Sequence, residues 1–282
     1  MVPQLHSHYI NGGAVADDLV SYVGSIPENY DRYRASDFEP YADDLAGRVA
    51  IAGPRGPILE LACGTGILTE RLRARLPLSV RIVATDLNPP MLEYARTKRG
   101  GVPGIEWQQA DAVTLPFPSG SYDAVTCQFG FMFVPDKVAA FREARRVLAP
   151  GGLLAFNVWD SLQANQSMHI VQQAISSFLG HQPGFFDLPY GLHDRSFLRD
   201  LVQSSGFQQI EISTVSIRTV SPSAHALATG IVTGSPASLE LRQRGIAFEP
   251  VIEAAAATLA RAFGDCPCET DRRAVVVTAR AP

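Results

Sequence analysis

The chain has 282 residues, of which 46% are hydrophobic and 18% are charged. Soluble domains usually carry about a quarter charged residues, so this composition predicts a large core or an apolar pocket and excludes a disordered chain. The formal net charge of −4 leaves no basic excess for a phosphate backbone, and we do not expect a nucleic-acid ligand.

Localisation signals and clustered cysteines are sparse. Met1–His6 lacks the basic stretch and apolar run of a secretory signal. The longest apolar runs, such as Gly152–Val158, fall far below the roughly 18 residues that a membrane span needs. Cys266–Cys268 has neither a second cysteine pair nor a histidine partner at zinc-site spacing. We therefore expect a reduced, cytoplasmic protein without a membrane span or a bound metal.

Short apolar runs alternate with helical patterns over the first part of the chain. The runs predict strands at Pro57–Cys63, Arg81–Asp86, Ile105–Ala110, Tyr122–Phe129 and Leu153–Val158. The helical patterns lie at Ile67–Leu76, Pro89–Arg99 and Asp136–Leu148. Strands joined through helices need crossover connections, so this alternation predicts a mostly parallel sheet that is covered on both faces.

The pattern changes after Trp159. A helix is expected at Ser196–Ser205, followed by a long alternating strand at 207–220 and a final strand at 274–281. Two further segments, 161–194 and 223–271, do not belong to the alternation. Insertions of this length on the ligand side of a sheet are natural lids over a pocket, although ordinary packing helices would give the same pattern.

The most specific feature is the turn Glu60–Gly66 (ELACGTG), which follows the first predicted strand. Glycines at this position let the backbone approach a ligand without an intervening Cβ atom. Asp86 ends the next predicted strand, where a carboxylate can accept hydrogen bonds from both hydroxyls of a ribose. Together these residues predict a cofactor that contains a nucleoside.

Two residues favour one kind of nucleoside cofactor over another. A dinucleotide site would carry a third glycine where Thr69 stands, to allow close packing of the helix that binds the pyrophosphate. Glu60 would repel a diphosphate, whereas it suits a ligand with an ammonium or sulfonium charge. This pattern of charge favours S-adenosylmethionine over NAD.

Four segments, in this order, resemble the motifs of class I S-adenosylmethionine-dependent methyltransferases, and the similarity is closest to the UbiE-like, small-molecule (methyltransferase type 11) branch. They are Ile58–Thr69 (ILELACGTGILT), Val83–Leu92 (VATDLNPPML), Gln109–Phe117 (QADAVTLPF) with Ser121–Thr126 (SYDAVT), and Phe141–Gly152 (FREARRVLAPGG). The resemblance implies an α/β, Rossmann-like, doubly wound fold. Its sheet would be mostly parallel and seven-stranded with the last strand antiparallel, and helical lid insertions would be added to it.

The resemblance also implies how the chain is organised. Residues 1–282 would form a single methyltransferase domain, in which helices within 1–52 close over the cofactor and 53–160 form the cofactor-binding core. The insertions 161–194 and 223–271 would be lids on the substrate side, and the strands at 207–220 and 274–281 would complete the sheet.

The cofactor site that the resemblance implies can be given residue by residue. Glu60 and the glycines would line the methionine end of S-adenosylmethionine, Asp86 would hold the ribose, and Leu87 would pack on the adenine. The full set is Tyr33, Glu60, Gly64, Thr65, Gly66, Asp86, Leu87, Met91, Asp111, Ala112, Gln128 and Phe129.

Aromatic residues suggest the nature of the methyl acceptor. We expect a small, apolar or aromatic molecule in a pocket formed by Phe133, Phe185, Phe186 and Tyr190. Methyl transfer from a sulfonium is an in-line displacement that depends mainly on proximity and on exclusion of water, so a general base is optional. His193 is the one candidate for such a base.

Several alternatives stay open at this point. The chain could bind S-adenosylmethionine or S-adenosylhomocysteine without turnover, or it could be a nucleotide-dependent oxidoreductase. The nucleophilic atom of the acceptor (O, N, C or S) is not readable from the residues. Neither is the oligomeric state, for which a homodimer is one option.

Overall fold

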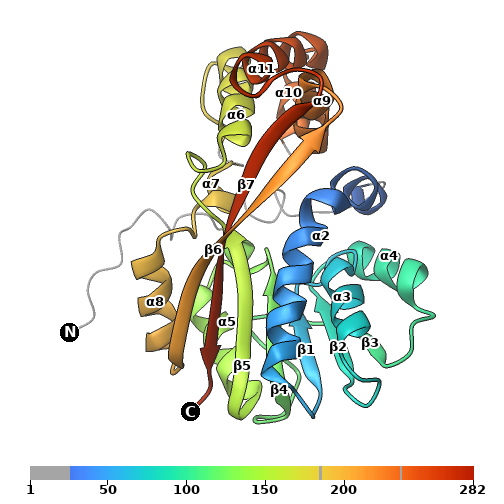
Figure 1. Cartoon of the computed structure of the whole chain (residues 1–282), viewed down its shortest axis with the longest axis vertical. Coiled ribbons are helices and arrows are strands. Elements are labelled where there is room, and N and C mark those ends of the chain that lie inside the picture. The colour runs from blue at the N-terminus through green and yellow to red at the C-terminus, as the bar shows by residue number, and fades with distance from the viewer. Residues whose placement is uncertain (1–25, 184–185, 236) are drawn as a thin grey trace.

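A computed structural model describes residues 26–183, 186–235 and 237–282, which are coloured in Figure 1. Between residues 26 and 37, side chains are described only for Glu28 and Asp31. The first 25 residues of the predicted N-terminal segment 1–52 lie outside the described part of the chain.

The centre of the protein is a seven-stranded sheet with the order β3-β2-β1-β4-β5-β7-β6. Its strands are β1 (Ile58–Leu61), β2 (Ile82–Asp86), β3 (Ile105–Gln109), β4 (Tyr122–Gln128), β5 (Leu148–Trp159), β6 (Gln208–Ser221) and β7 (Cys268–Arg280). Strands β1 to β5 are parallel, and β7 runs antiparallel to both β5 and β6. This topology confirms the predicted α/β, Rossmann-like sheet with an antiparallel last strand.

Helices cover both faces of the sheet, as crossovers between parallel strands require. On one face α2 (Ile26–Ala52) packs against α3 (Ile67–Arg75) and α4 (Pro89–Arg99). On the other face α5 (Lys137–Val147) packs against α8 (Arg195–Ser204). All residues of β1 and β2 are buried between these layers, which explains why both strands are mostly apolar in the sequence, apart from Glu60 and the Thr85-Asp86 end of β2.

The last two strands extend beyond the rest of the sheet (Figure 1). Strand β5 pairs with β7 only at Ala274–Arg280, whereas β6 pairs with β7 from Cys268 onward. The final strand therefore begins six residues before the predicted 274–281. The added segment, Cys268–Arg273 (CETDRR), is polar, so the sequence gives no apolar signal for a strand there. In the structure its residues alternate between buried and exposed, as in other strands.

Four helices gather on this extended hairpin, and we call them the cap. They are α6 (Gln166–Leu179), α9 (Ala224–Gly234), α10 (Ala237–Gln243) and α11 (Phe248–Phe263). The helices α6 and α10 each pack against α9, and α11 packs against both α6 and α9. Two short elements, η2 (Phe131–Phe133) and α7 (Asp187–Tyr190), contact each other between the sheet and the cap.

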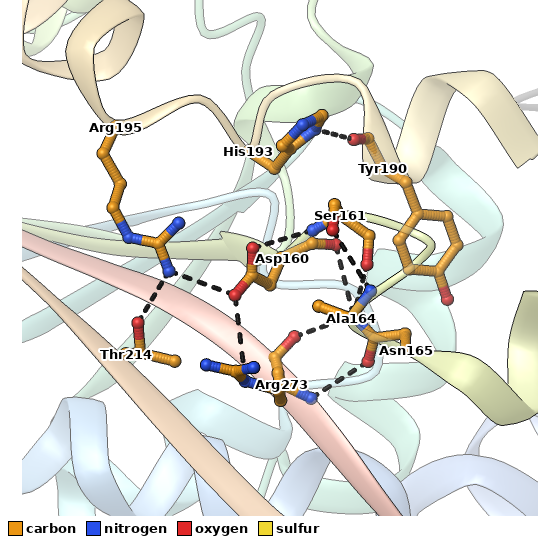
Figure 2. A network of polar contacts seen from close by, with 9 residues as sticks. All are labelled: Asp160, Ser161, Ala164, Asn165, Tyr190, His193, Arg195, Thr214 and Arg273. Atoms are coloured by element: carbon orange, nitrogen blue, oxygen red, sulfur yellow. Dashed lines mark hydrogen bonds and ion pairs between the residues drawn. The ribbon is translucent and has the colours of Figure 1, made fainter.

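A polar network joins the cap to the end of β5 (Figure 2). The Asn165 amide donates to the carbonyl oxygens of Asp160 and Arg273, and its Oδ1 accepts from the Arg273 N–H at 2.9 Å. The Asp160 carboxylate accepts from Arg195 at 3.1 Å. Burial alone would raise the pKa of Asp160, but the bonds from Arg195 and Ser161 hold it below its usual value. The start of α6 is thus held on β7 by directed hydrogen bonds.

Candidate functional site

The turn after β1 adopts backbone conformations that favour glycine. Gly64 and Gly66 have φ angles of +55° and +83°, and Ala62 has a φ of +52°. A Cβ atom at Gly66 would lie 2.8 Å from the ring of Trp107, so a side chain at this position would force the ring to move. The turn therefore brings backbone, rather than side chains, to the edge of the sheet, where α3 then begins.

Asp86 supports this turn from the end of β2. The Gly64 N–H donates to its Oδ2 and the Asn88 N–H to its Oδ1, both at 2.8 Å. Burial raises the pKa of Asp86, and the bonds from Asn88 and Gly64 oppose that shift. The carboxylate therefore braces the glycine turn in addition to facing the space above it.

Glu60, in β1, is a buried acid without a full set of partners. It is 1% exposed, and its Oε2 has no hydrogen-bond partner among the described residues. Burial raises the pKa of Glu60 to about 8; contacts with Thr69 lower it, and the charge of Asp86 raises it further. An unpaired buried carboxylate is costly, which is a reason to expect a cationic group beside it.

These residues line a cavity of about 480 Å³ at the carboxyl ends of β1, β2 and β4. Its lining includes the acids Glu60, Asp86, Asp111 and Asp136 but no lysine, arginine or histidine of the described chain. The other lining residues are Phe38, Ala62, Cys63, Gly64, Thr65, Ile67, Leu68, Leu87, Asn88, Met91, Ala110, Ala112, Val113, Gln128, Phe129, Gly130, Phe133, Val134 and Pro135. The acids give the cavity a negative potential.

The end of β4 supplies the opposite wall of the cavity. Phe129 has a φ of +51°, and its N–H donates to both the backbone oxygen and Oδ1 of Asn157, at 3.1 and 3.0 Å. The Gln128 amide donates to the Phe38 carbonyl oxygen at 3.0 Å, while its Oε1 is buried with no partner among the described residues. A strained backbone held by several hydrogen bonds is typical of functional sites.

An aromatic cluster stands behind this wall. Phe129 stacks on Trp159 with ring centroids 4.0 Å apart, and Phe38 meets Phe129 edge-on at 5.4 Å. Tyr41 contacts both Phe129 and Trp159. Because Phe38 and Phe129 also line the cavity, one side of it is aromatic while the side near Glu60 is acidic.

Most residues of the predicted cofactor set line this cavity. They are Glu60, Gly64, Thr65, Asp86, Leu87, Met91, Asp111, Ala112, Gln128 and Phe129. Gly66 shapes the turn without lining the cavity. Tyr33 lies in α2, but its side chain is outside the described part of the structure.

The predicted acceptor residues are spread over the molecule. Phe133 lines the cavity, whereas Phe186 and Tyr190 are buried in the hydrophobic core and are not part of its lining. Phe185 lies outside the described residues. His193 is also away from the cavity lining, and its Nδ1 lies 2.6 Å from the Tyr190 carbonyl oxygen. Figure 2 shows His193 pointing toward that carbonyl group.

Several lining residues were not singled out by the sequence reasoning, among them Phe38 and Asp136. Phe38 belongs to the buried face of α2, together with Tyr41, Ala42 and Leu45, and this helical spacing was the available signal. Asp136 caps α5 by accepting from the Ala139 N–H at 2.9 Å, so its local signal was that of an ordinary helix start.

Neither a membrane-spanning helix nor a metal-binding cluster is found in residues 26–183, 186–235 and 237–282. Within these residues, no helix is long and apolar enough to cross a membrane. In the same part of the chain, no group of three or more histidine, cysteine, aspartate or glutamate side chains could hold a metal ion. Cys63 lines the cavity, but burial raises the pKa of its thiol well above the usual value, which disfavours a reactive thiolate.

Comparison with known proteins identifies the domain. A family profile for a methyltransferase domain matches residues 59–156. The demethylmenaquinone methyltransferase of Deinococcus radiodurans is 42% identical over 110 residues, which are 39% of this chain and 45% of that protein. A ubiquinone/menaquinone biosynthesis C-methyltransferase, UbiE of Shewanella frigidimarina, is 42% identical over 109 residues, 38% of this chain and 43% of that protein. The chain thus spans less than half the length of these curated relatives.

The fold comparison extends over more of the chain. The structure of a Bacillus halodurans protein proposed to be a methyltransferase has a TM-score of 0.55 and 20% identity, covering 85% of this chain and 99% of that chain. At this identity the likeness supports the fold alone, and the sequence matches support the family. Residues 59–156 therefore match a methyltransferase domain, and this part of the chain is similar in sequence to the demethylmenaquinone methyltransferase and UbiE relatives.

Proposed function

We propose that the protein transfers a methyl group from S-adenosylmethionine to a small, apolar or aromatic acceptor. The observation that carries this proposal is the buried Glu60 carboxyl group, whose Oε2 has no partner, in a cavity that includes four acids and no basic side chain, both statements being made of the described residues. An ammonium or sulfonium group beside Glu60 would supply the missing partner, whereas a diphosphate would be repelled.

The cofactor fits the donors and acceptors of this cavity. The unpartnered oxygens of Glu60 and Gln128 can accept hydrogen bonds from an ammonium group, and Gly64, which also lines the cavity, has no side chain to obstruct it. Asp86 can accept from ribose hydroxyls with the lone pairs that Gly64 and Asn88 leave free. Leu87, Met91, Asp111 and Ala112, which also line the cavity, would hold the adenine.

The chain promotes the reaction mainly through position and exclusion of water. Bound S-adenosylmethionine supplies an electrophilic methyl group. Phe38, Phe129 and Phe133 form an apolar wall that can hold a flat acceptor against the cavity and keep water out. The lining contains no histidine among the described residues, so we expect no histidine base and assign most of the rate to proximity.

The names of the relatives suggest one acceptor class. One is named for demethylmenaquinone and the other as a C-methyltransferase of ubiquinone/menaquinone biosynthesis. We therefore propose a quinol ring, methylated at carbon, as the first acceptor to test. An aromatic wall beside the cavity suits such a ring, because stacked rings bury large apolar surfaces.

We further propose that the chain works as one methyltransferase domain over residues 1–282, with 53–160 as its cofactor-binding core. The segments 161–194 and 223–271 would act on the acceptor side as lids. Support for the cofactor-binding core comes from the lining, which, apart from Phe38, draws on residues between Glu60 and Asp136 of the described chain.

Titration calorimetry with S-adenosylmethionine, S-adenosylhomocysteine and NADH tests the cofactor assignment, and a reduced demethylmenaquinone analogue with product mass spectrometry tests the transfer. We expect binding of the first two ligands, none of NADH, and a product heavier by one methyl group. Binding without transfer across a panel of O, N, C and S acceptors would indicate a binding protein without turnover. Failure to bind either sulfur ligand would overturn the proposal.

A further inference from the structure

One carboxylate in the first turns of α2 collects three partners from α4. Asp31 has a side chain only 4% exposed, and it pairs with Lys98 and, at 3.5 Å, with Arg99. The Tyr94 hydroxyl donates to the same carboxylate at 3.4 Å. Burial alone would raise the pKa of Asp31, but Lys98 and Arg99 hold it below its usual value, so the group is ionised at neutral pH. Helix α2 is therefore bound to α4 by a buried charge.

Arg99 connects this carboxylate to the glycine turn. Its Nη1 donates to the Thr65 carbonyl oxygen at 2.5 Å, and its Nε pairs with Glu70 in α3 at 3.1 Å. Thr65 is a lining residue of the cavity, between Gly64 and Gly66. One buried guanidinium thus joins α2, the glycine turn and α3, and a planar fork of donors suits this task better than an ammonium group.

The same stretch of α2 is also held on the far side of the cavity. The Phe38 carbonyl oxygen accepts from Gln128, and Phe38 itself lines the cavity. Two residues later Pro40, inside the helix, lacks an N–H and removes one backbone hydrogen bond. Beyond Pro40, Tyr41 and Leu45 are buried in the core. Side-chain bonds at Asp31 and Gln128 therefore fix the part of α2 that precedes Pro40.

We propose that Asp31 is a positioning residue of the cofactor site, which it serves through Arg99. Ionised Asp31 keeps the guanidinium oriented so that Arg99 holds the Thr65 carbonyl, and with it the backbone of the glycine turn, in the geometry that receives the methionine end of the cofactor. It also keeps the start of α2 against that turn. This inference rests on the proposed function, because it assumes that S-adenosylmethionine occupies the cavity.

The test compares Asp31→Asn with a matched control on the same helix. Asp43→Asn removes an equally charged group that pairs with Arg75 at 2.8 Å on a half-exposed face away from the cavity. We expect calorimetry to show about tenfold or greater weakening of S-adenosylhomocysteine binding for Asp31→Asn, since small misplacements of binding groups have such effects, and less than about twofold for the control. In turnover, the cofactor KM should rise while kcat at saturating cofactor stays near that of the wild type.

Arg99→Lys gives an independent test, because it keeps the positive charge but loses the planar guanidinium group that contacts both Asp31 and Thr65. If Asp31 acts through Arg99, the double variant Asp31→Asn/Arg99→Lys will bind S-adenosylhomocysteine no more weakly than the single variant that has the lower affinity. Unchanged affinity in Asp31→Asn, equal losses in the control, or additive losses in the double variant would each reject the inference. If circular dichroism shows that Asp31→Asn does not fold, Arg99→Lys and Lys98→Met take its place. Their affinity for S-adenosylhomocysteine, cofactor KM and kcat are then measured in the same way. If the wild-type protein binds no S-adenosylhomocysteine, the proposed function fails, which is a separate outcome.

Discussion

The two parts of the sheet differ in what they contribute to the cavity. Strands β1, β2 and β4 end at a common edge, and the cavity lies there, with no lining residue beyond Asp136 among the described residues. Strands β6 and β7 run past that edge toward the four cap helices, whose described residues contribute nothing to the lining. The matched methyltransferase domain, residues 59–156, coincides with the first part. Changes in the two parts should therefore have separable effects on cofactor binding and on stability.

The largest expected effect is on cofactor binding, from Asp86→Ala. This variant loses the group proposed to hold the ribose and also the acceptor for the Gly64 N–H. We expect affinity for S-adenosylhomocysteine to fall by about 2–3 kcal/mol, the range for hydrogen bonds to a charged partner. Calorimetry measures this affinity, with Glu249→Gln in the cap as the control. Wild-type affinity in Asp86→Ala would remove this residue from the site.

The next largest effect is expected on stability, from a change in the network that holds the cap. Asn165→Ala deletes the side chain that bonds the backbone of both Asp160 and Arg273, shown in Figure 2. Buried carbonyl and N–H groups then lose partners, so we expect about 2 kcal/mol less stability in urea unfolding. Cofactor affinity should stay within about twofold, because the network is not part of the cavity lining. A large loss of affinity would show that the two parts are coupled.

An effect of similar size but opposite sign is expected from Glu60→Gln. The pKa of Glu60 rises from 4.5 to about 8 in the folded protein. Its protonation favours the folded state fully below the unfolded pKa, and this contribution is lost as pH rises toward the folded pKa. Unfolding measured from about pH 5 to 8 should show the wild type losing stability relative to Glu60→Gln, by roughly 1–3 kcal/mol. Parallel stability curves for the two proteins would contradict this.

The same variant should bind the cofactor less tightly, because the amide cannot neutralise a cation. In the wild type, affinity should rise with pH up to about 8, since binding of a cation beside Glu60 favours the ionised carboxyl group. Calorimetry in buffers of different ionisation enthalpy would detect the released proton. No proton release in the wild type would show that Glu60 does not face the cationic group.

The smallest effect is expected on the outer hairpin. Arg218 pairs with Glu269 at 3.2 Å and is mostly exposed. Ion pairs of this kind contribute little in water, so Arg218→Ala should change stability by less than about 0.5 kcal/mol. Thermal unfolding in low and high salt checks this. A loss above about 1 kcal/mol would mean that the long hairpin depends on its surface charges.

Local patterns were sufficient for the parallel part of the fold. The strand, the glycine turn and Asp86 follow one another within a short stretch of chain, so spacing alone placed them at one edge of a sheet. The polar start of β7 could not be recognised, because Cys268–Arg273 becomes a strand only by pairing with β6. Its alternation of buried and exposed residues is a property of the tertiary structure.

The aromatic side chains show a different limit. Their aromatic character suggests that Phe133, Phe186 and Tyr190 are shielded from water, but it does not distinguish a cavity wall from a packed core. The structure places Phe133 at the cavity and the other two in the core. Similarly, nothing local to Asp31 in the sequence reveals its pairing with Arg99, which lies 68 residues away.

The contact between the ends of β1 and β4 limits which positions of the cavity can be substituted in a variant library. A Cβ atom at Gly130 would lie 2.5 Å from the Cβ of Ala62 and 2.6 Å from the sulfur of Cys127. A side chain at Gly130 would therefore collide with Ala62 and Cys127, and Ala62 itself has a φ of +52°, which larger side chains rarely adopt. A library aimed at new methyl acceptors should leave both positions unchanged and vary Phe133 and Val134, where the chain has already turned away from the sheet.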